Sequence, residues 1–174
     1  MARRHRSTPG GYVYHVCNRG SRKGVLFESC EDYLAFITLM EEARRKRPMR
    51  ITAYCLMSNH VHFLLWPEGD DDVPRFMKWL TATHASRWHR RRESVGSGAV
   101  YQSRYVSRAI SDTRQLLSAM RYVERNALTA GAVKRAEEWR WSSAWNLDDS
   151  RSSFTTDPGP ITRPPNWLKI LNDV

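Results

Sequence analysis

Two histidines interrupt an apolar run in the stretch Cys55-Leu56-Met57-Ser58-Asn59-His60-Val61-His62-Phe63-Leu64-Leu65. Side chains alternate between the two faces of a β-strand, so His60 and His62 would share one face. The opposite face would carry Val61, Phe63 and Leu65, an apolar set suited to a protein core. The two imidazoles would lie about 6–7 Å apart along the backbone, which suits two ligands of one metal ion. The alternative is a pair of partly exposed histidines on a solvated face, since H-x-H alone is short and common.

The residues around this stretch predict a β-hairpin and further elements on both sides of it. Ser58-Asn59 is a tight-turn signal between expected strands at 50–57 and 60–66. Periodicity and capping residues predict the other elements. These are a strand at 11–18, a helix at 31–47, a helix from Pro74, strand pieces within 100–110, and a helix from Asp112 or Thr113 to about Ala127.

The order of these elements predicts the fold. The first six follow the order β-α-β-β-α-β, which indicates an α+β fold: a ferredoxin-like antiparallel sheet with two helices on one face. The histidines would then point from the open face toward the third helix. We expect residues 1–131 to form this core, including that helix. Residues 132–174, a Trp-rich segment and a Pro/Ser/Asp tail, are expected to pack on the core or trail from it, partly disordered.

The net charge of +10 at pH 7 is concentrated in two segments. Residues 1–50 carry 11 Lys and Arg against 5 Asp and Glu, and residues 75–108 carry 8 against 1. Such clustering is typical of proteins that bind a polyanion, with nucleic acid the first candidate. A membrane surface is the second, weakened because no basic helix has a clean apolar face. A generally basic, soluble surface is the remaining alternative.

Cysteines and apolar runs bear on the compartment. Three cysteines without a C-x-x-C pattern indicate neither a disulfide framework nor a zinc knuckle. The N-terminus lacks the apolar core of a signal peptide, and no apolar run approaches the length of a membrane span. We therefore expect a cytoplasmic protein that does not enter a membrane.

The expected third helix carries Arg121-Tyr122-Val123-Glu124-Arg125-Asn126. Tyr122 and Asn126 are four residues apart and so share a helical face. The Asn126 amide oxygen would join His60 and His62 as a third ligand of a divalent cation, Mg²⁺ or Mn²⁺. Tyr122 could then attack a phosphodiester and form a 5′-phosphotyrosine link with a free 3′-OH. The alternatives are a tyrosine that only packs and an asparagine at a fraying helix end.

Several basic side chains are candidate DNA contacts. The Gly-containing loop at 19–24 could bind phosphate or be a solvated turn. Arg121 or Arg125 could stabilise the phenolate of Tyr122. The full set of candidates is Arg19, Arg22, Lys23, Arg91, Arg104, Arg121 and Arg125.

The chain resembles the single-tyrosine HUH transposases, most closely the REP-associated tyrosine transposases. In order, the matching pieces cover roughly residues 10–145. They are Gly11-Tyr12-Val13-Tyr14-His15-Val16-Cys17-Asn18-Arg19-Gly20, residues 53–65 around the two histidines, Tyr101-Gln102-Ser103-Arg104-Tyr105, residues 121–126 and Trp141-Ser142-Ser143.

The resemblance implies metal-dependent cleavage and rejoining of single-stranded DNA, usually at hairpins formed by palindromic repeats. By motif position, it implies that His60 and His62 bind the metal, that Tyr122 is the nucleophile and that Asn126 is the third ligand. The chain departs from the family pattern at two positions. Glu124 stands where the family usually has His, and Ala127 where it usually has Pro. A carboxylate so close to Tyr122 would repel phosphate or act as an alternative ligand.

Two other functions remain open at this point. One is a retired transposase or other non-catalytic protein that binds single-stranded nucleic acid, although the Gly-Phe-rich signature of RNA-recognition domains is absent. The other is a metal-dependent nuclease that uses water. The sequence leaves open the DNA target, whether the protein is a monomer or a homodimer, and whether Tyr122 acts with its own histidines or a partner's.

Overall fold

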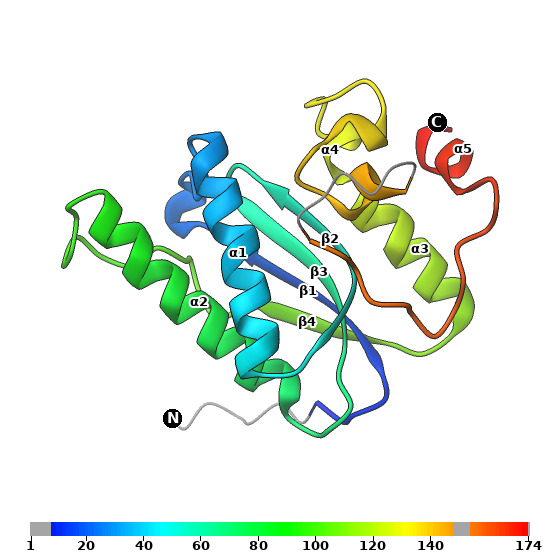
Figure 1. Ribbon diagram of the computed structural model, residues 1–174, viewed down its shortest axis with the longest axis horizontal. Coiled ribbons are helices and arrows are strands. Elements are labelled where there is room, and N and C mark those ends of the chain that lie inside the picture. Colours follow the sequence, from blue (N-terminus) through cyan, green and yellow to red (C-terminus); the bar gives the residue numbers. More distant parts are fainter. Residues whose placement is uncertain (1–7, 148–153, 174) are drawn as a thin grey trace.

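The computed structural model describes residues 8–147 and 154–173. Residues 1–7 of the basic N-terminal arm and residues 148–153 of the tail lie outside them. A four-stranded sheet separates two helical layers, with α1 and α2 on one face and α3 on the other (Figure 1). The elements are β1 (Val13–Arg19), α1 (Cys30–Lys46), β2 (Arg50–Met57), β3 (His60–Trp66), α2 (Asp72–Arg91), β4 (Val106–Ile110), α3 (Thr113–Glu124), α4 (Asn126–Thr129) and α5 (Trp167–Asn172), with short 3₁₀ turns at Ser21–Lys23, Ala136–Glu138 and Ser143–Asn146.

The sheet is antiparallel throughout, with strand order β2-β3-β1-β4. The predicted α+β class with an antiparallel sheet is therefore confirmed. The hairpin of β2 and β3 has the predicted bounds, and its register places Met57 opposite His60. β1 lies beside β3, with Cys17 opposite His62. This central position of β1 is what brings its side chains next to the histidines.

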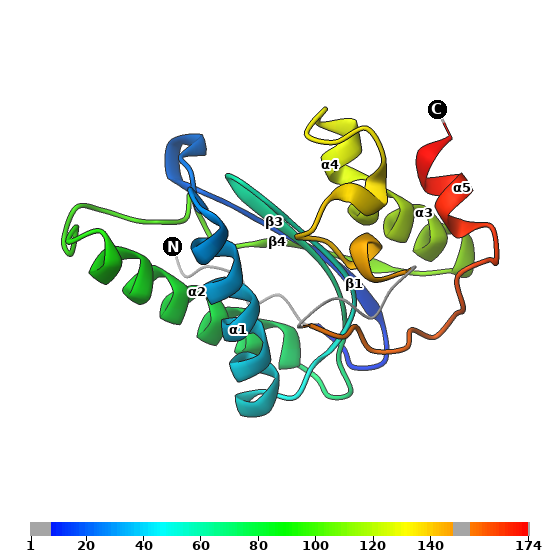
Figure 2. The same cartoon turned by 45° about the horizontal axis from the view of Figure 1, so that its top comes forward.

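One face of the sheet packs against α1 and α2, as the figures show from two directions (Figures 1 and 2). Val61, Phe63 and Leu65 all point to this side and are at most 1% exposed. The helical spacing of apolar residues in α1 places Phe36 and Met40 against them. The alternation within β3 therefore sends its apolar set into the larger core and its histidines to the other face.

The other face packs against α3. Leu116, Met120 and Val123 are buried on it, next to side chains of β2 and β3. The helix begins at Asp112, whose side chain accepts a hydrogen bond from the Gln115 backbone N–H at 2.8 Å. It ends earlier than predicted, at Glu124, and α4 starts directly beyond Arg125. The packing stripe of α3 leaves Tyr122 outside the core, 52% exposed.

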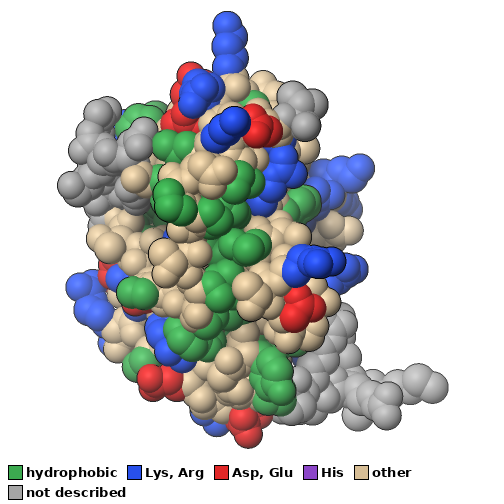
Figure 3. Space-filling view, turned by 90° about the vertical axis from the view of Figure 1, so that its right-hand side faces the viewer, with side chains coloured by type: hydrophobic (Ala, Val, Ile, Leu, Met, Phe, Trp, Pro, Cys, Tyr) green, Lys and Arg blue, Asp and Glu red, His purple; other side chains and the backbone are tan. Residues whose placement is uncertain are grey.

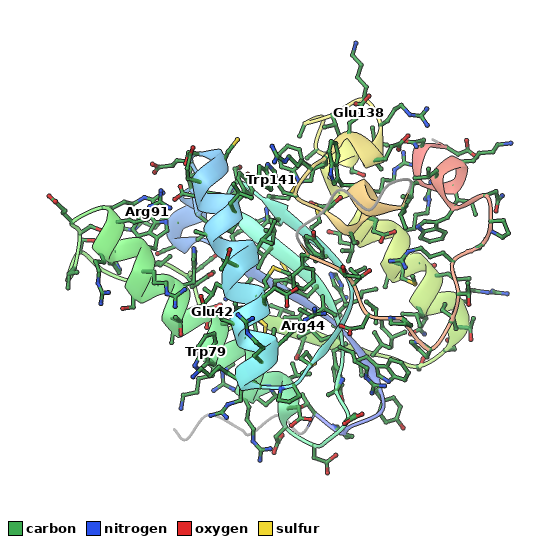
Figure 4. All side chains as sticks on the ribbon, in the orientation of Figure 1. Glu42, Arg44, Trp79, Arg91, Glu138 and Trp141 are labelled. Atoms are coloured by element: carbon green, nitrogen blue, oxygen red, sulfur yellow. The ribbon has the colours of Figure 1, made fainter. Side chains whose placement is uncertain are left out.

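The described part of the C-terminal segment packs against the sheet and the helices. It covers β2, one of the two edge strands of the sheet. The Leu56 N–H donates to the Trp141 carbonyl at 2.8 Å. Trp141 stacks on Tyr33 of α1 with ring centroids 4.7 Å apart (Figure 4). Farther along, Trp167 and Leu171 of α5 are buried against α3. An edge strand exposes unpaired backbone groups, and here the Trp-rich segment satisfies part of them. Within the described residues, no helix is long and apolar enough to cross a membrane.

His84 is a buried titratable group in the larger core. Its Nδ1 lies 2.7 Å from the Tyr101 hydroxyl, and its ring packs against Phe27 and Phe36. Burial lowers its pKa to about 4. Since the unfolded chain binds this proton more tightly, stability is complete above pH 6.5 and falls as the pH drops toward 4.

We expect His84 to cost the protein about 3 kcal/mol of unfolding free energy between pH 7 and pH 4. Urea unfolding of the parent and of His84→Gln at several pH values measures this. The difference in stability between the two proteins should shift in favour of the variant as the pH falls. A constant difference across that range would show that His84 does not titrate as its burial predicts.

Candidate active site

His60 and His62 lie on the open face of β3, beneath α3. Their ring centroids are 5.0 Å apart, and His62 is only 4% exposed. The alternation of the strand dictates this placement, since Val61 between them enters the opposite core. As predicted, the two imidazoles lie side by side on one face of the strand.

Tyr122 and Asn126 come from above the histidines, on consecutive turns at the end of α3 and the start of α4. The Tyr122 ring meets the His62 ring edge-on, with centroids 5.4 Å apart. The Asn126 Oδ1 lies 3.2 Å from His60 Nε2. The structure thus brings together all four residues for which the sequence predicted a catalytic or metal-binding role. Tyr122 and Asn126 are four residues apart, the spacing that places two side chains on the same face of a helix.

His15 of β1 is a fifth member of this cluster, and sequence reasoning missed it. Its Nε2 lies 3.0 Å from His62 Nδ1, and the two rings stack with centroids 5.2 Å apart. The same ring lies 5.6 Å from that of Tyr122. Alternation within the first strand could have placed His15 on one face, but nothing local indicated that this strand lies beside β3.

All three imidazoles are neutral at neutral pH. The pKa of His62 is lowered to about 3, first by burial and then by the positive charge that His60 and His15 carry when protonated and by the charge of Arg19. Burial lowers the pKa of His60, although Asn126 Oδ1, which would accept a hydrogen bond from the protonated ring, acts in the opposite direction. Burial and then the Arg108 charge lower the pKa of His15. A neutral imidazole keeps the lone pair that a metal ligand needs.

The donor set fits a divalent cation. His60 Nδ1 lies 2.7 Å from Asn59 Oδ1, while its Nε2 faces Asn126 Oδ1. A neutral imidazole has one N–H, so it can donate to only one of these oxygens. With the proton on Nδ1, the shorter contact, two lone pairs face each other at Asn126. A cation held by both atoms would remove this conflict.

The Asn126 amide oxygen is available as a third ligand. In the described part of the chain, no group of three or more His, Cys, Asp or Glu side chains could hold a metal ion. Asn126 Oδ1 could complete a ligand set with His60 and His62, together with oxygens of the substrate or of water. An oxygen-rich set of this kind suits a hard ion.

Two arginines bring positive charge to the histidines. Arg19 of β1 is opposite His60 in the register, and Arg108 of β4 is opposite His15. Arg19 was a predicted DNA contact, whereas Arg108 was not among the candidates. Both side chains are exposed, so they can reach a phosphate bound at the cluster.

The other predicted cations lie elsewhere. Arg22 and Lys23 are exposed in the 3₁₀ turn after β1, both with positive φ. Arg91 forms an ion pair with Asp32 at 3.3 Å, on the side of the sheet that carries α1 and α2 (Figure 4). Arg104 lines a pocket beside α2. These residues do not join the histidine cluster.

Arg121 and Arg125 differ from their predicted role. Arg121 donates to the carbonyls of Ile170 and Asp173 at 2.9 and 2.8 Å, and Arg125 donates to that of Leu171 at 3.0 Å. These hydrogen bonds attach the C-terminal helix α5 to the end of α3, and they direct both guanidinium groups toward its carbonyls. The surface near α5 shows hydrophobic side chains between its Lys and Arg groups (Figure 3).

With this geometry described, comparison with known proteins identifies the family. Residues 10–126 match the family described as "Transposase IS200 like". The match spans more than half of the chain and includes the histidines, Tyr122 and Asn126.

The chain belongs to the IS200-like transposase family.

Relatives and one solved structure agree with this membership. The "REP-associated tyrosine transposase" of Escherichia coli (strain K12) is 26% identical over 160 residues, which cover 88% of each protein. A Haemophilus influenzae relative, whose name also describes a REP-associated tyrosine transposase, is 22% identical over 182 residues, or 96% of each. The resemblance noted in the sequence is thus confirmed.

The fold is shared with a solved relative. The structure described as "Structure of the REP associates tyrosine transposase bound to a REP hairpin" superimposes with a TM-score of 0.67 over 93% of each chain, at 22% identity. At this identity the likeness concerns the fold, including the antiparallel sheet and the helices on its two faces.

In this IS200-like transposase, the Glu124 carboxylate is held by hydrogen bonds from other residues of the chain. It is fully buried, and its carboxylate accepts hydrogen bonds from Ser143 Oγ at 2.7 Å, Arg163 Nη2 at 2.6 Å and Trp167 Nε1 at 2.6 Å. Although it follows Tyr122 by two residues, it points away from the histidines toward the C-terminal segment. In this position it neither meets a phosphate at Tyr122 nor serves as a metal ligand.

We expect Glu124→Ala to lower the unfolding free energy by about 3–5 kcal/mol, because it leaves the partly buried Arg163 guanidinium without its carboxylate and the Trp167 indole N–H without its acceptor. Urea unfolding measures the loss. Glu42→Gln is the matched control, since Glu42 pairs with Arg87 at the surface and should contribute less than about 1 kcal/mol. Equal losses in the two variants would contradict the role of Glu124 in attaching the C-terminal segment.

Proposed function

We propose that this transposase cleaves and rejoins single-stranded DNA through Tyr122 and a 5′-phosphotyrosine intermediate. The observation that carries the proposal is the convergence of Tyr122, His60, His62 and Asn126 at one place on the open face of the sheet. In this proposal the sheet is a ferredoxin-like platform, and α3 is the catalytic helix that presents the nucleophile.

The reaction exchanges one phosphate ester for another. Tyr122 Oη attacks the phosphorus, the Oη–P bond forms and the bond to the 3′ oxygen breaks. The phenol loses its proton and the departing oxygen gains one, which gives a free 3′-OH and a 5′ end attached to Tyr122. Rejoining is the reverse, with a 3′-OH attacking the phosphotyrosine. Because the ester is conserved, no separate energy source is needed.

The surrounding residues position the groups that react. Tyr122 is half exposed, so its hydroxyl is open to a strand lying across the site. Arg19 and Arg108 supply positive charge for the phosphate. His15 orients His62 by its contact with Nδ1, and a His62 ring protonated at Nδ1 would leave Nε2 for ligation.

The site would hold Mg²⁺ or Mn²⁺ through His60, His62 and Asn126, and a bound ion would polarise the scissile phosphate. A hard, exchangeable ion suits an amide oxygen and phosphate oxygens. The substrate would be single-stranded DNA next to a hairpin of a palindromic repeat. Membership in the family and the solved relative bound to a REP hairpin support this choice.

A trapping assay distinguishes the proposal from its alternatives. A single strand containing a hairpin is labelled on either side of the cleavage site, incubated with Mg²⁺ and separated under denaturing conditions. We expect label on the 5′ side of the break to appear as free product, and label on the other side to migrate with the protein. Product without an adduct would indicate a nuclease that uses water. Binding without product would indicate a non-catalytic nucleic-acid-binding protein.

A further inference from the structure

A pocket of about 550 Å³ lies on the opposite face of the sheet from the histidines, between α2 and the segment that leads into β4. Its lining includes Asn18 from β1, Lys78 and Ala82 from α2, and residues 103–105. None of the contacts that place Tyr122 and the histidines involves this pocket.

The irregular segment that precedes β4 forms one wall of the pocket. The Gln102 N–H donates to the Arg19 carbonyl at 2.9 Å, and Val106 pairs with Cys17. Since Tyr101 is also bridged to Gly20, residues 102–105 stand opposite only two residues, Asn18 and Arg19. The extra backbone bends away from the strand and opens a space toward α2.

The lining combines positive charge with an aromatic ring. Lys78 and Arg104 are exposed, and neither forms an ion pair with another described residue. Tyr105 is partly buried and packs on the larger core. Among the described residues the lining contains no carboxylate, whereas the cavities next to Glu68 and Asp72 mix acidic and basic groups. An anionic ligand with a flat, polarisable part fits this lining best.

Asn18 adds a polar group that can read such a ligand. It is 5% exposed, and its Oδ1 accepts the Arg19 backbone N–H at 3.0 Å. This contact fixes the amide plane and leaves the Nδ2 group without an acceptor among the described residues. An amide N–H₂ at the wall of a pocket can donate to a ring nitrogen or carbonyl of a base.

The pocket and the histidine site share one end of β1. Asn18 points to the α2 face, and the next residue, Arg19, is opposite His60 on the other face. The edge strand β4 begins between the two, with Val106 53% exposed. A flexible strand that passes through the histidine site can therefore turn around this edge and reach the pocket within a few nucleotides.

We propose that this pocket binds one unpaired nucleotide of the DNA strand that is cleaved. Its base stacks on Tyr105 and accepts a hydrogen bond from Asn18, and its phosphate lies between Lys78 and Arg104. The inference rests on the proposed function, because it assigns the ligand to the same substrate strand. The pocket would then recognise a base of the DNA sequence next to the cleavage site.

The test measures binding with the full chain carrying Tyr122→Phe, so that no cleavage occurs. One abasic nucleotide is moved along the single-stranded flank of a hairpin substrate. We expect one position where it weakens binding about tenfold. In Tyr105→Leu the intact strand should bind about tenfold more weakly, and the abasic nucleotide at that position should have no further effect.

Because Tyr105 packs on the larger core, Tyr105→Leu could weaken binding by loosening the fold, and a second variant that leaves Tyr105 intact is needed. Ala82→Trp fills the pocket from the exposed surface of α2 and should remove the same position-dependent effect. Lys169→Gln, on α5, changes a residue outside the pocket and should keep the position-dependent effect. Persistence of the effect in both pocket variants, or its absence at every position of the parent, would overturn the proposal.

Two further measurements separate the possible failures. Free deoxynucleoside monophosphates should bind at least about a hundredfold more weakly than the strand, and equal affinity would overturn the proposal in favour of a soluble nucleotide. Adduct formation is measured separately with Tyr122 intact. An adduct without an abasic-sensitive position rejects the pocket alone, and an abasic-sensitive position without an adduct rejects cleavage alone.

Discussion

Tyr122→Phe should reduce covalent attachment to DNA below detection, a loss of at least about a thousandfold, while binding changes by less than about twofold. The phenol oxygen is the only atom removed, and it is the atom that would form the ester. The side chain is 52% exposed and lies outside the packing stripe of α3, so the protein should keep its stability. Gel-shift titration measures binding, and denaturing electrophoresis measures the adduct.

Tyr12→Phe is a close control for this change. Tyr12 is also 52% exposed, but it precedes β1 and does not contact the histidines. Its variant should form the adduct at the parent rate. If Tyr122→Phe still forms an adduct, another residue is the nucleophile, and the geometry around Tyr122 has a different purpose.

His60→Ala and His62→Ala should each lower the cleavage rate by more than the roughly 10–100-fold that loss of a second-shell metal partner costs. Each variant removes one of the two imidazoles that would ligate the ion, and the remaining donors are too few to hold it. Titration calorimetry with Mn²⁺ alone should show binding to the parent and weak or no binding to the variants. Chelation of the metal should stop cleavage by the parent but leave DNA binding intact.

Stability is the control for the histidine variants. Because His62 is buried, its replacement can affect packing, and thermal unfolding must show that the variant is folded at the assay temperature. His60 is less buried and is the safer test. Variants that bind Mn²⁺ like the parent, yet lose activity, would place the metal elsewhere and assign the histidines another role.

The sequence predicted the parts of this site that depend on local periodicity. The alternation of β3 placed His60 and His62 together, and the helical spacing placed Tyr122 and Asn126 together. The bounds of β2 and β3 followed from the Ser58-Asn59 turn between two apolar runs. Each of these predictions needed only residues close together in the chain.

The parts that the sequence did not predict depend on which distant segments pack together. His15 meets His62 only because β1 lies between β3 and β4, and Arg108 joins them through the same pairing. Arg121 and Arg125 lie on the predicted helix, but their guanidinium groups donate to backbone carbonyls of α5. Local patterns identify a charged side chain without showing which distant carbonyl will accept its hydrogen bonds.

The most direct measurement is mass spectrometry of the protein after reaction with a hairpin-containing single strand and Mg²⁺, followed by nuclease and protease digestion. We expect the peptide that contains Tyr122 to carry the mass of a nucleotide joined through its 5′ phosphate, with fragmentation assigning it to Tyr122. The same peptide should be unmodified when the metal is chelated. A nucleotide on any other residue, or cleaved DNA with no modified peptide, would contradict the proposed mechanism.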